Sequence, residues 1–303
     1  LKQMYFLFMG TRPIIHWYFF GLILAGLNFG YLSAQSASKQ RIVSLGGSVT
    51  ETIFALGSGP KVVAVDISSL YPTAVHSLPQ VGYFRTLSAE GVLSLNPDLI
   101  LASEGSGPPT TIEQLRNSGV EFISIPDGFG PDVALQKIRM ISSILNLTEE
   151  GKKLENQVKE QLERVERLRK LVQTPPRVAF IWGNGNTGVR LAGSATGADL
   201  MLELAGAINA AASLTGYQPM SAEAVIVAEP EFYIIPESTV TGIGGIDELM
   251  KLPGIGDTPA GLNSRIIVVD LLAFIGFGPR VGEALLNLMS HLHPEITNDE
   301  IFN

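Results

Sequence analysis

A tyrosine and an arginine two positions apart form the stretch of this sequence best suited to chemistry. Residues 78–91 read LPQVGYFRTLSAEG and contain Tyr83 and Arg85. In extended chain, residues i and i+2 point to the same side, so a phenol and a guanidinium would share one face. The pair is therefore either a ligand with the residue that tunes it, or a loop aromatic beside an unrelated cation.

The first 34 residues predict a signal peptide. Lys2 and Arg12 precede the apolar run WYFFGLILAGL, and small residues follow up to Ala34. This order of basic, apolar and small residues is typical of a secretory signal. The alternative is a membrane anchor, but a span needs ~20 consecutive apolar residues and this run is shorter. We expect export with cleavage at Ala34.

The composition limits the possible cellular compartments and binding partners of the protein. The 303 residues include no cysteine and carry a net charge of -8. A chain without cysteine has no disulfide, no thiol nucleophile and no cysteine for a lipid anchor. An exported, unanchored protein stays near the cell when an outer membrane retains it, so we expect a periplasmic protein. The acidic balance argues against nucleic acid as a partner.

Strand and helix patterns alternate between residues 41 and 126. The runs RIVSL, KVVAVD, DLILAS and VEFISIP read as strands, and helical patterns separate them. Strands that alternate with helices predict a parallel sheet with helices on both faces. Ser48 and Glu51 have the spacing of a capping box, which predicts that they begin the first helix.

Residues 148–172 predict one long helix. Its apolar residues recur at helical spacing amid dense charge. They are Leu154, Val158, Leu162, Val165 and Leu168. At 1.5 Å per residue such a helix would be about 37 Å long, enough to cross between two domains.

The sequence after this helix resembles the sequence before it. RVAFIWG at 177 is similar to RIVSLGG at 41, and SAEAVIVAEPEFYII at 221 is similar to SAEGVLSLNPDLIL at 88. We therefore predict an α/β fold of two Rossmann-like lobes with central parallel sheets, joined by one long helix. The predicted parts are a signal peptide (1–34), an N-terminal lobe (35–147), the linking helix (148–172) and a C-terminal lobe (173–303). A cleft between two such lobes is a favoured ligand site.

From about Arg41 to Pro294 the chain resembles the class III substrate-binding proteins of ABC importers. The segments GGSVTETIFALG, LPQVGYFRTLSAEGVLSLNPDLILAS, GYQPMSAEAVI and GFGPRVGEAL look like those of periplasmic haem-binding proteins. The resemblance implies a protein that is not an enzyme. It would capture ferric haem b between its lobes and deliver it to an ABC permease dimer with ATPase subunits. It would act as a monomer that docks at the inner membrane. Related proteins bind ferric siderophores or cobalamin, and these ligands remain alternatives.

The resemblance also assigns roles to residues. It implies that Tyr83 is the axial ligand of the haem iron and that Arg85 lies beside it. A phenol ordinarily has a pKa of about 10, so ligation at neutral pH requires that the phenolate is favoured, which ferric iron and a nearby cation both do. Arginine suits this position because it stays charged.

Two glutamates and several cleft residues complete the predicted site. Glu90 and Glu223 occupy equivalent SAE segments, and the resemblance implies that they dock to the two permease subunits. Each would also stabilise the N-terminus of its helix, which alone explains a glutamate there. Further candidates to tune the ligand or line the cleft are Tyr71, Arg190, Tyr217, Phe274 and Phe277.

Histidine is not expected to ligate the iron. His76 reads as an exposed residue, and His291 and His293 fall at the end of the last long helix, where histidine commonly caps carbonyls. Some haem carriers of this family have a histidine in the second lobe, but IWGNGNTGVRLAGS contains none. We therefore expect one haem.

The main rival interpretation comes from the same glycine-rich segment. Gly183, Gly185 and Gly188 match G-x-G-x-x-G after a strand, the dinucleotide fingerprint. That fingerprint should open directly into a helix, whereas VRLAGSAT intervenes here. A nucleotide-dependent enzyme is therefore the alternative from another class, and we interpret these glycines as a wall of the cleft.

Overall fold

Two β-sheets form the frame of the structure, a computed structural model that describes residues 40–184 and 188–302. Both sheets belong to one compact unit, Arg41–Asn303. The predicted signal peptide, residues 1–34, lies outside the described residues. In the described part of the chain, no helix is both long and apolar enough to span a membrane.

The first sheet is parallel and has the strand order β2-β1-β3-β4. The strands are β1 (Ile42–Leu45), β2 (Val62–Val65), β3 (Leu99–Ser103) and β4 (Glu121–Ile125). The helices of this lobe are α2 (Gly47–Ala55), η1 (Gly59–Lys61), η2 (Thr73–Ser77), α3 (Ala89–Leu93), α4 (Pro109–Arg116) and α5 (Pro131–Ile144). Every residue of the central strands β1 and β3 is buried, as expected for strands covered on both faces.

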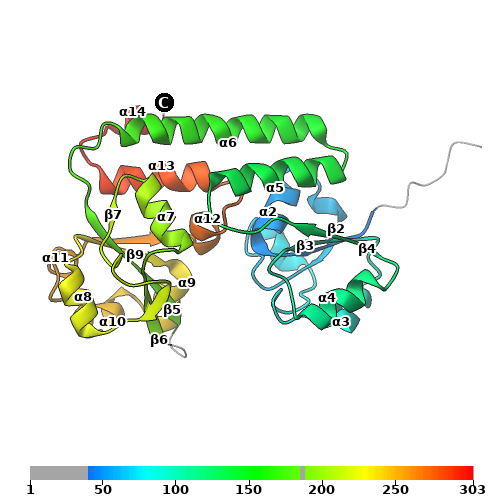
Figure 1. The fold of residues 1–303 in the computed structure, drawn as a ribbon, viewed down its shortest axis with the longest axis horizontal. Helices are drawn as coiled ribbons and strands as arrows, with labels where there is room; N and C mark the ends of the chain where they lie inside the picture. The colour runs from blue at the N-terminus through cyan, green and yellow to red at the C-terminus, as the bar shows by residue number, and fades with distance from the viewer. Residues whose placement is uncertain (1–39, 185–187, 303) are drawn as a thin grey trace, which may run out of the picture. The chain divides into compact units, whose positions relative to one another are not determined.

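The linking helix forms as predicted but ends earlier. Helix α6 (Thr148–Arg169) has 22 residues. The chain then turns, with Leu171 N–H donating to the Leu168 carbonyl. Figure 1 shows α6 running beside α5 and α13 (Val281–Leu292), one helix from each lobe, and it contacts both. The boundaries of the two lobes stay predictions.

The second sheet is mixed, with parallel strands on one side and antiparallel strands on the other. Its order is β10-β9-β5-β6-β8, with β7 paired to β5. The strands are β5 (Arg177–Asn184), β6 (Gly188–Ala192), β7 (Ile208–Asn209), β8 (Tyr217–Pro219), β9 (Phe232–Pro236) and β10 (Ile266–Val269). Strands β10, β9, β5 and β7 pair in parallel, whereas β6 and β8 are antiparallel. The predicted α/β fold of two lobes with central parallel sheets is thus confirmed, and the second sheet carries an antiparallel extension, β6 and β8, beside its parallel strands.

The helices of the second lobe are short except for α13. They are α7 (Gly197–Leu204), α8 (Ala222–Ala228), α9 (Glu237–Ile243), α10 (Ile246–Met250), α11 (Pro259–Leu262), α12 (Leu271–Ile275) and α14 (Asn298–Phe302). One hydrophobic core joins α5, α6, α7, α12 and α13. Because this core includes helices of both lobes, the lobes are packed against each other as well as linked by α6.

The two SAE segments form matching helix starts, one in each lobe. Ser88 is the N-cap of α3, and its Oγ accepts from Gly91 N–H. Ser221 is the N-cap of α8, and its Oγ accepts from Ala224 N–H. A parallel strand follows each helix, β3 after α3 and β9 after α8. This equivalence agrees with the internal similarity seen in the sequence.

The predicted capping box at the first helix was wrong. The N-cap of α2 is Gly46, and no side chain caps this helix. Ser48 and Glu51 lie inside α2 and are buried. Ser48 Oγ accepts from Lys137 Nζ at 2.9 Å, and Glu51 pairs with Arg280 at 2.8 Å. These polar side chains serve contacts away from their own helix, which local spacing does not reveal.

Candidate functional site

Tyr83 lies on a tight turn before α3. The Thr86 N–H donates to the Tyr83 carbonyl at 2.8 Å, which closes a turn over residues 83–86. The Tyr83 side chain is 38% exposed, whereas Phe84 packs into the core of the first lobe. The backbone is therefore turned rather than extended, so strand alternation does not decide which way Tyr83 and Arg85 point.

Neighbouring backbone holds this turn in place. Ile67 N–H donates to the Gly82 carbonyl at 2.9 Å. Gly107 N–H donates to the Phe84 carbonyl, and Leu87 N–H donates to the Gly107 carbonyl, both at 2.9 Å. Bonds on both sides of the turn restrict its motion, so Tyr83 is presented to solvent from a fixed backbone.

Arg85 and Tyr83 contact the same phenylalanine. The Arg85 guanidinium lies 4.8 Å from the centre of the Phe84 ring. The Tyr83 ring meets Phe84 edge to face, with 4.9 Å between ring centres. Among the described residues, no hydrogen bond joins the Tyr83 and Arg85 side chains. The structure thus brings the two residues to one aromatic ring without a hydrogen bond between them.

Two predicted residues of the second lobe lie together at the β6–β8 edge. Arg190 Nη1 donates to the Tyr217 carbonyl at 3.3 Å. The Tyr217 ring packs edge to face on Trp182, with 5.1 Å between ring centres. Burial raises the pKa of Tyr217, and a backbone hydrogen bond from Ala198 offsets this only in part. Burial therefore disfavours the Tyr217 phenolate, and this phenol is a poorer ligand than an exposed one.

Phe274 and Phe277 are core residues, so the prediction that they line an open cleft was wrong. They are 1% and 0% exposed. Phe274 stacks on Phe180 with 5.3 Å between ring centres. Phe274 lies in α12 and Phe277 follows this helix, and both rings pack into the core shared by the two lobes. Phe129 is the exposed aromatic here, 6.1 Å from the Phe277 ring.

Tyr71 belongs to a different environment, at the contact between the lobes. Its ring lies 3.7 Å from the Arg280 guanidinium carbon. Both side chains line a cavity of about 370 Å³ together with Glu51 and residues of α6. The GFGPRVGEAL segment was recognised in the sequence, but no role at this contact was predicted for Arg280 or Glu51. Lys137 was also missed, although its place on the apolar stripe of α5, between Ala134 and Ile141, is a detectable signal.

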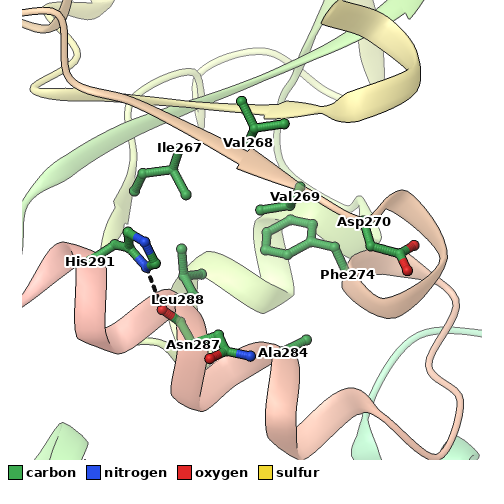
Figure 2. Close-up of a pocket in the computed structure, with 9 residues that line it drawn as sticks. All are labelled: Ile267, Val268, Val269, Asp270, Phe274, Ala284, Asn287, Leu288 and His291. Carbon is green, nitrogen blue, oxygen red and sulfur yellow. Dashed lines mark hydrogen bonds between the residues drawn. The ribbon is translucent and has the colours of Figure 1, made fainter. Parts of the chain in front are cut away.

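The structure describes three of the four histidines. His76 is exposed in η2, and His293 is buried with Nε2 at 2.8 Å from the Ala205 carbonyl, just past α7. His291 is one of the residues that line a cavity of about 270 Å³ between β10 and α13. Figure 2 shows its Nδ1 hydrogen-bonded to the Asn287 carbonyl. Of the predicted site residues, only Phe274 lines that cavity.

The glycine-rich segment forms a β-hairpin. Strand β5 continues to Asn184, and β6 starts at Gly188 and pairs back on β5. Gly185 lies outside the described residues. A dinucleotide fingerprint requires a helix at this point, so the dinucleotide interpretation is wrong. In the described part of the chain, no group of three His, Cys, Asp or Glu side chains could hold a metal ion.

Glu90 and Glu223 present free carboxylates. Both are exposed in the first turn of their helices, α3 and α8. Within the described residues, neither side chain forms an ion pair or a hydrogen bond. Two unengaged carboxylates at equivalent places, one per lobe, suit a partner with paired cationic sites.

The comparisons with known proteins define the class. Residues 42–271 match the family described as periplasmic binding protein. The chain belongs to this family of substrate-binding proteins, which are not enzymes. One solved structure, described as periplasmic heme-binding protein RhuT from Roseiflexus sp. RS-1 in apo form, is 41% identical in sequence. It superposes with a TM-score of 0.81, and the match covers 86% of this chain and 99% of that one.

Two curated relatives have other descriptions. A Bacillus subtilis protein described as an uncharacterized ABC transporter substrate-binding lipoprotein is 29% identical over 84% of this chain and 81% of its own length. A vitamin B12-binding protein of Photorhabdus laumondii is 25% identical over 85% of this chain and 89% of its own length. The descriptions thus differ: one names heme, one names vitamin B12, and one names an ABC transporter without a ligand.

Proposed function

We propose that this protein binds one ferric haem b through Tyr83, between its lobes, and delivers it to an ABC permease from the periplasm. The observation that carries the proposal is the exposed Tyr83 phenol on a fixed turn beside Arg85. No described histidine lies on such a turn, since His76 is in η2, His291 is in α13 and His293 follows α13 directly. The similarity to a heme-binding protein supports the same ligand.

The chemistry of the phenol supports the ferric state. Tyrosine ligates haem as phenolate, an anionic oxygen donor that favours ferric over ferrous iron. The exposed Phe129 ring would offer an apolar face to the porphyrin, and Arg85 and Arg190 are exposed cations suited to the haem propionates. A carrier benefits from this arrangement because haem held in the ferric state by a phenolate ligand stays chemically inert during transport.

Delivery would use the two free carboxylates. Glu90 and Glu223 would pair with cationic pockets on the two permease subunits while the lobes present the haem. Because the equivalent helices α3 and α8 place one carboxylate on each lobe, the docking face matches a partner with two similar subunits.

A visible absorption titration with ferric haem tests the proposal. The chain from Gln35 onward should saturate near one equivalent and show a phenolate-to-iron charge-transfer band. Tyr83→Ala should lose this band, and Tyr71→Phe, the control at another exposed tyrosine, should keep it. If wild type leaves the haem spectrum unchanged, or if Tyr83→Ala keeps the band, the proposal is wrong.

Cobalamin is the second candidate ligand, because a relative over most of the chain is described as a vitamin B12-binding protein. A corrinoid carries its own cobalt ligands and would need no phenolate from the protein. The same titration with cyanocobalamin distinguishes the two functions. Saturable binding that is insensitive to Tyr83→Ala would favour cobalamin over haem.

A further inference from the structure

The Arg85 guanidinium occupies a defined place beside Gly105. Its Nη1 would lie 3.1 Å from a Cβ atom built on Gly105. The other side of the guanidinium faces the Phe84 ring at 4.8 Å. Gly105 follows β3 by two residues, so Arg85 reaches across the carboxyl end of the first sheet. Any larger residue at position 105 would crowd this arginine.

A fixed carboxylate lies on the other side of the same glycine. Asp127 Oδ2 would also lie 3.1 Å from the Gly105 Cβ position. Ser103 Oγ donates to Oδ2 at 2.8 Å, and Gly128 N–H donates to Oδ1 at 3.0 Å. Lys137 Nζ, only 1% exposed, lies 3.9 Å from Oδ1. Three groups therefore hold the Asp127 carboxylate beside Gly105.

The two charged groups are close without forming a direct ion pair. Since each lies 3.1 Å from one point, they are separated by no more than about 6 Å. Opposite charges at this separation attract even when water screens them in part. The attraction draws Arg85 toward Gly105, whereas a phenolate at Tyr83 would draw the same cation toward itself. Asp127 and Tyr83 therefore compete for Arg85.

We propose that Asp127 is a positioning residue for Arg85, holding its guanidinium at Gly105 and limiting the charge that it places on the Tyr83 phenolate. Only the claim about the Tyr83 phenolate rests on the proposed haem function. The claim that Asp127 holds Arg85 concerns the protein without ligand. Because Lys137 also donates to the carbonyls of Gly276 and Phe277, the Asp127 carboxylate links the Tyr83 turn to a contact between the lobes.

The first test needs no haem. Nitrogen-15 NMR measures how fast the Arg85 Nε–H proton exchanges with water, with the signal assigned by its absence in Arg85→Ala. Asp127→Asn should speed this exchange roughly threefold or more, because the cation loses its partner. Gly105→Ala should do the same, because its Cβ pushes the groups apart. Asp132→Asn, which removes an exposed carboxylate elsewhere in the lobe, should change nothing. Unchanged exchange in both Asp127→Asn and Gly105→Ala would overturn the proposal.

The second test uses the haem-loaded protein. Asp127→Asn should shift the phenolate-to-iron band to higher energy, because a released Arg85 withdraws charge from the phenolate. Asp127→Glu should restore the wild-type band. In an Arg85→Ala background, Asp127→Asn should have no further effect. An equal shift without Arg85 would show that the carboxylate acts directly, which contradicts a positioning role.

The two tests separate the two claims. If wild type shows no band that depends on Tyr83, the proposed function fails, and the exchange measurement still decides whether Asp127 holds Arg85. If the band is present and depends on Tyr83 but ignores Asp127, the proposed function stands and the positioning role is wrong.

Discussion

Arg280 and Glu51, 229 positions apart, form a two-bonded ion pair across the lobes. Arg280 Nε donates to Oε1 at 2.8 Å, and Nη2 donates to Oε2 at 3.0 Å. Nη1 donates to Asp270 at 2.7 Å, and the Tyr71 ring lies against the guanidinium. Glu51 is 2% exposed. The pair joins α2 of one lobe to the start of α13 in the other, so it fixes the lobes relative to each other beside α6.

Loss of Arg280 should strongly destabilise the protein. Arg280→Ala would leave the Glu51 carboxylate buried without its partner, and breaking such a pair on one side costs roughly 3 to 5 kcal/mol. We expect a loss of about 3 kcal/mol in the free energy of unfolding, measured by urea denaturation. The control is Arg139→Ala, which breaks an exposed ion pair with Glu155 and should cost less than ~1 kcal/mol. Equal losses in the two variants would contradict a special role for the Arg280 pair.

The same pair should give stability a pH dependence. Burial raises the pKa of Glu51, and Arg280 lowers it by a smaller amount. A carboxyl with a raised folded-state pKa adds stability that is complete below the ordinary value of 4.5 and is lost as the pH rises through the raised value. Urea unfolding of wild type and Glu51→Gln should be compared from acidic to neutral pH. The free energy of unfolding of wild type, relative to that of Glu51→Gln, should fall as the pH rises above 4.5. A wild-type advantage that grows with pH would mean that Arg280, not burial, dominates.

The sequence predicted the elements whose signals are local. Strands such as Ile42–Leu45 and Leu99–Ser103 are continuous apolar runs between helices, and α6 shows helical spacing over six turns. Glu90 and Glu223 were placed at the N-termini of equivalent helices because the SAE segments repeat, and both lie in the first turn of their helices. Each of these predictions depends on residues within about one element, where periodicity and capping chemistry act.

The features that were missed depend on residues far apart in the chain. Glu51 has a capping-box spacing with Ser48, but burial against Arg280 decides its role. Phe277 was a candidate to line the cleft, whereas its ring packs into a core shared with α5 and α7. At each of these positions, tertiary packing overrides the preference of the local sequence.

Gly151 should be required for the close approach of α6 to α5. A Cβ atom there would overlap the Ser142 side chain. Gly151→Ala should therefore lower the free energy of unfolding by about 1 to 3 kcal/mol, although alanine is the better helix former. Gly91→Ala is the matched control, since its Cβ would meet only Ser88 at 3.7 Å and beyond. It should be neutral or stabilising by up to ~1 kcal/mol. Thermal and urea unfolding of both variants compare the two effects, and a stable Gly151→Ala would show that the helices can separate at no cost.

Delivery should fail when the free carboxylates are removed, while ligand binding persists. Glu90→Ala and Glu223→Ala should each weaken docking to a haem permease with its ATPase subunits in nanodiscs, and the double variant should weaken it most, because each lobe loses one charge-assisted contact. Haem-loaded protein is the probe, and stimulation of ATP hydrolysis is the readout.

The controls remove exposed carboxylates from other helices of the same lobes, Glu113→Ala in α4 and Glu203→Ala in α7. These variants should keep full stimulation. All four single variants should bind haem as wild type does, since within the described residues none of these carboxylates forms a hydrogen bond or an ion pair with Tyr83 or Arg85. If Glu90→Ala and Glu223→Ala stimulate hydrolysis as well as the controls, the exposed carboxylates serve only their helix N-termini, and the docking face lies elsewhere on the protein.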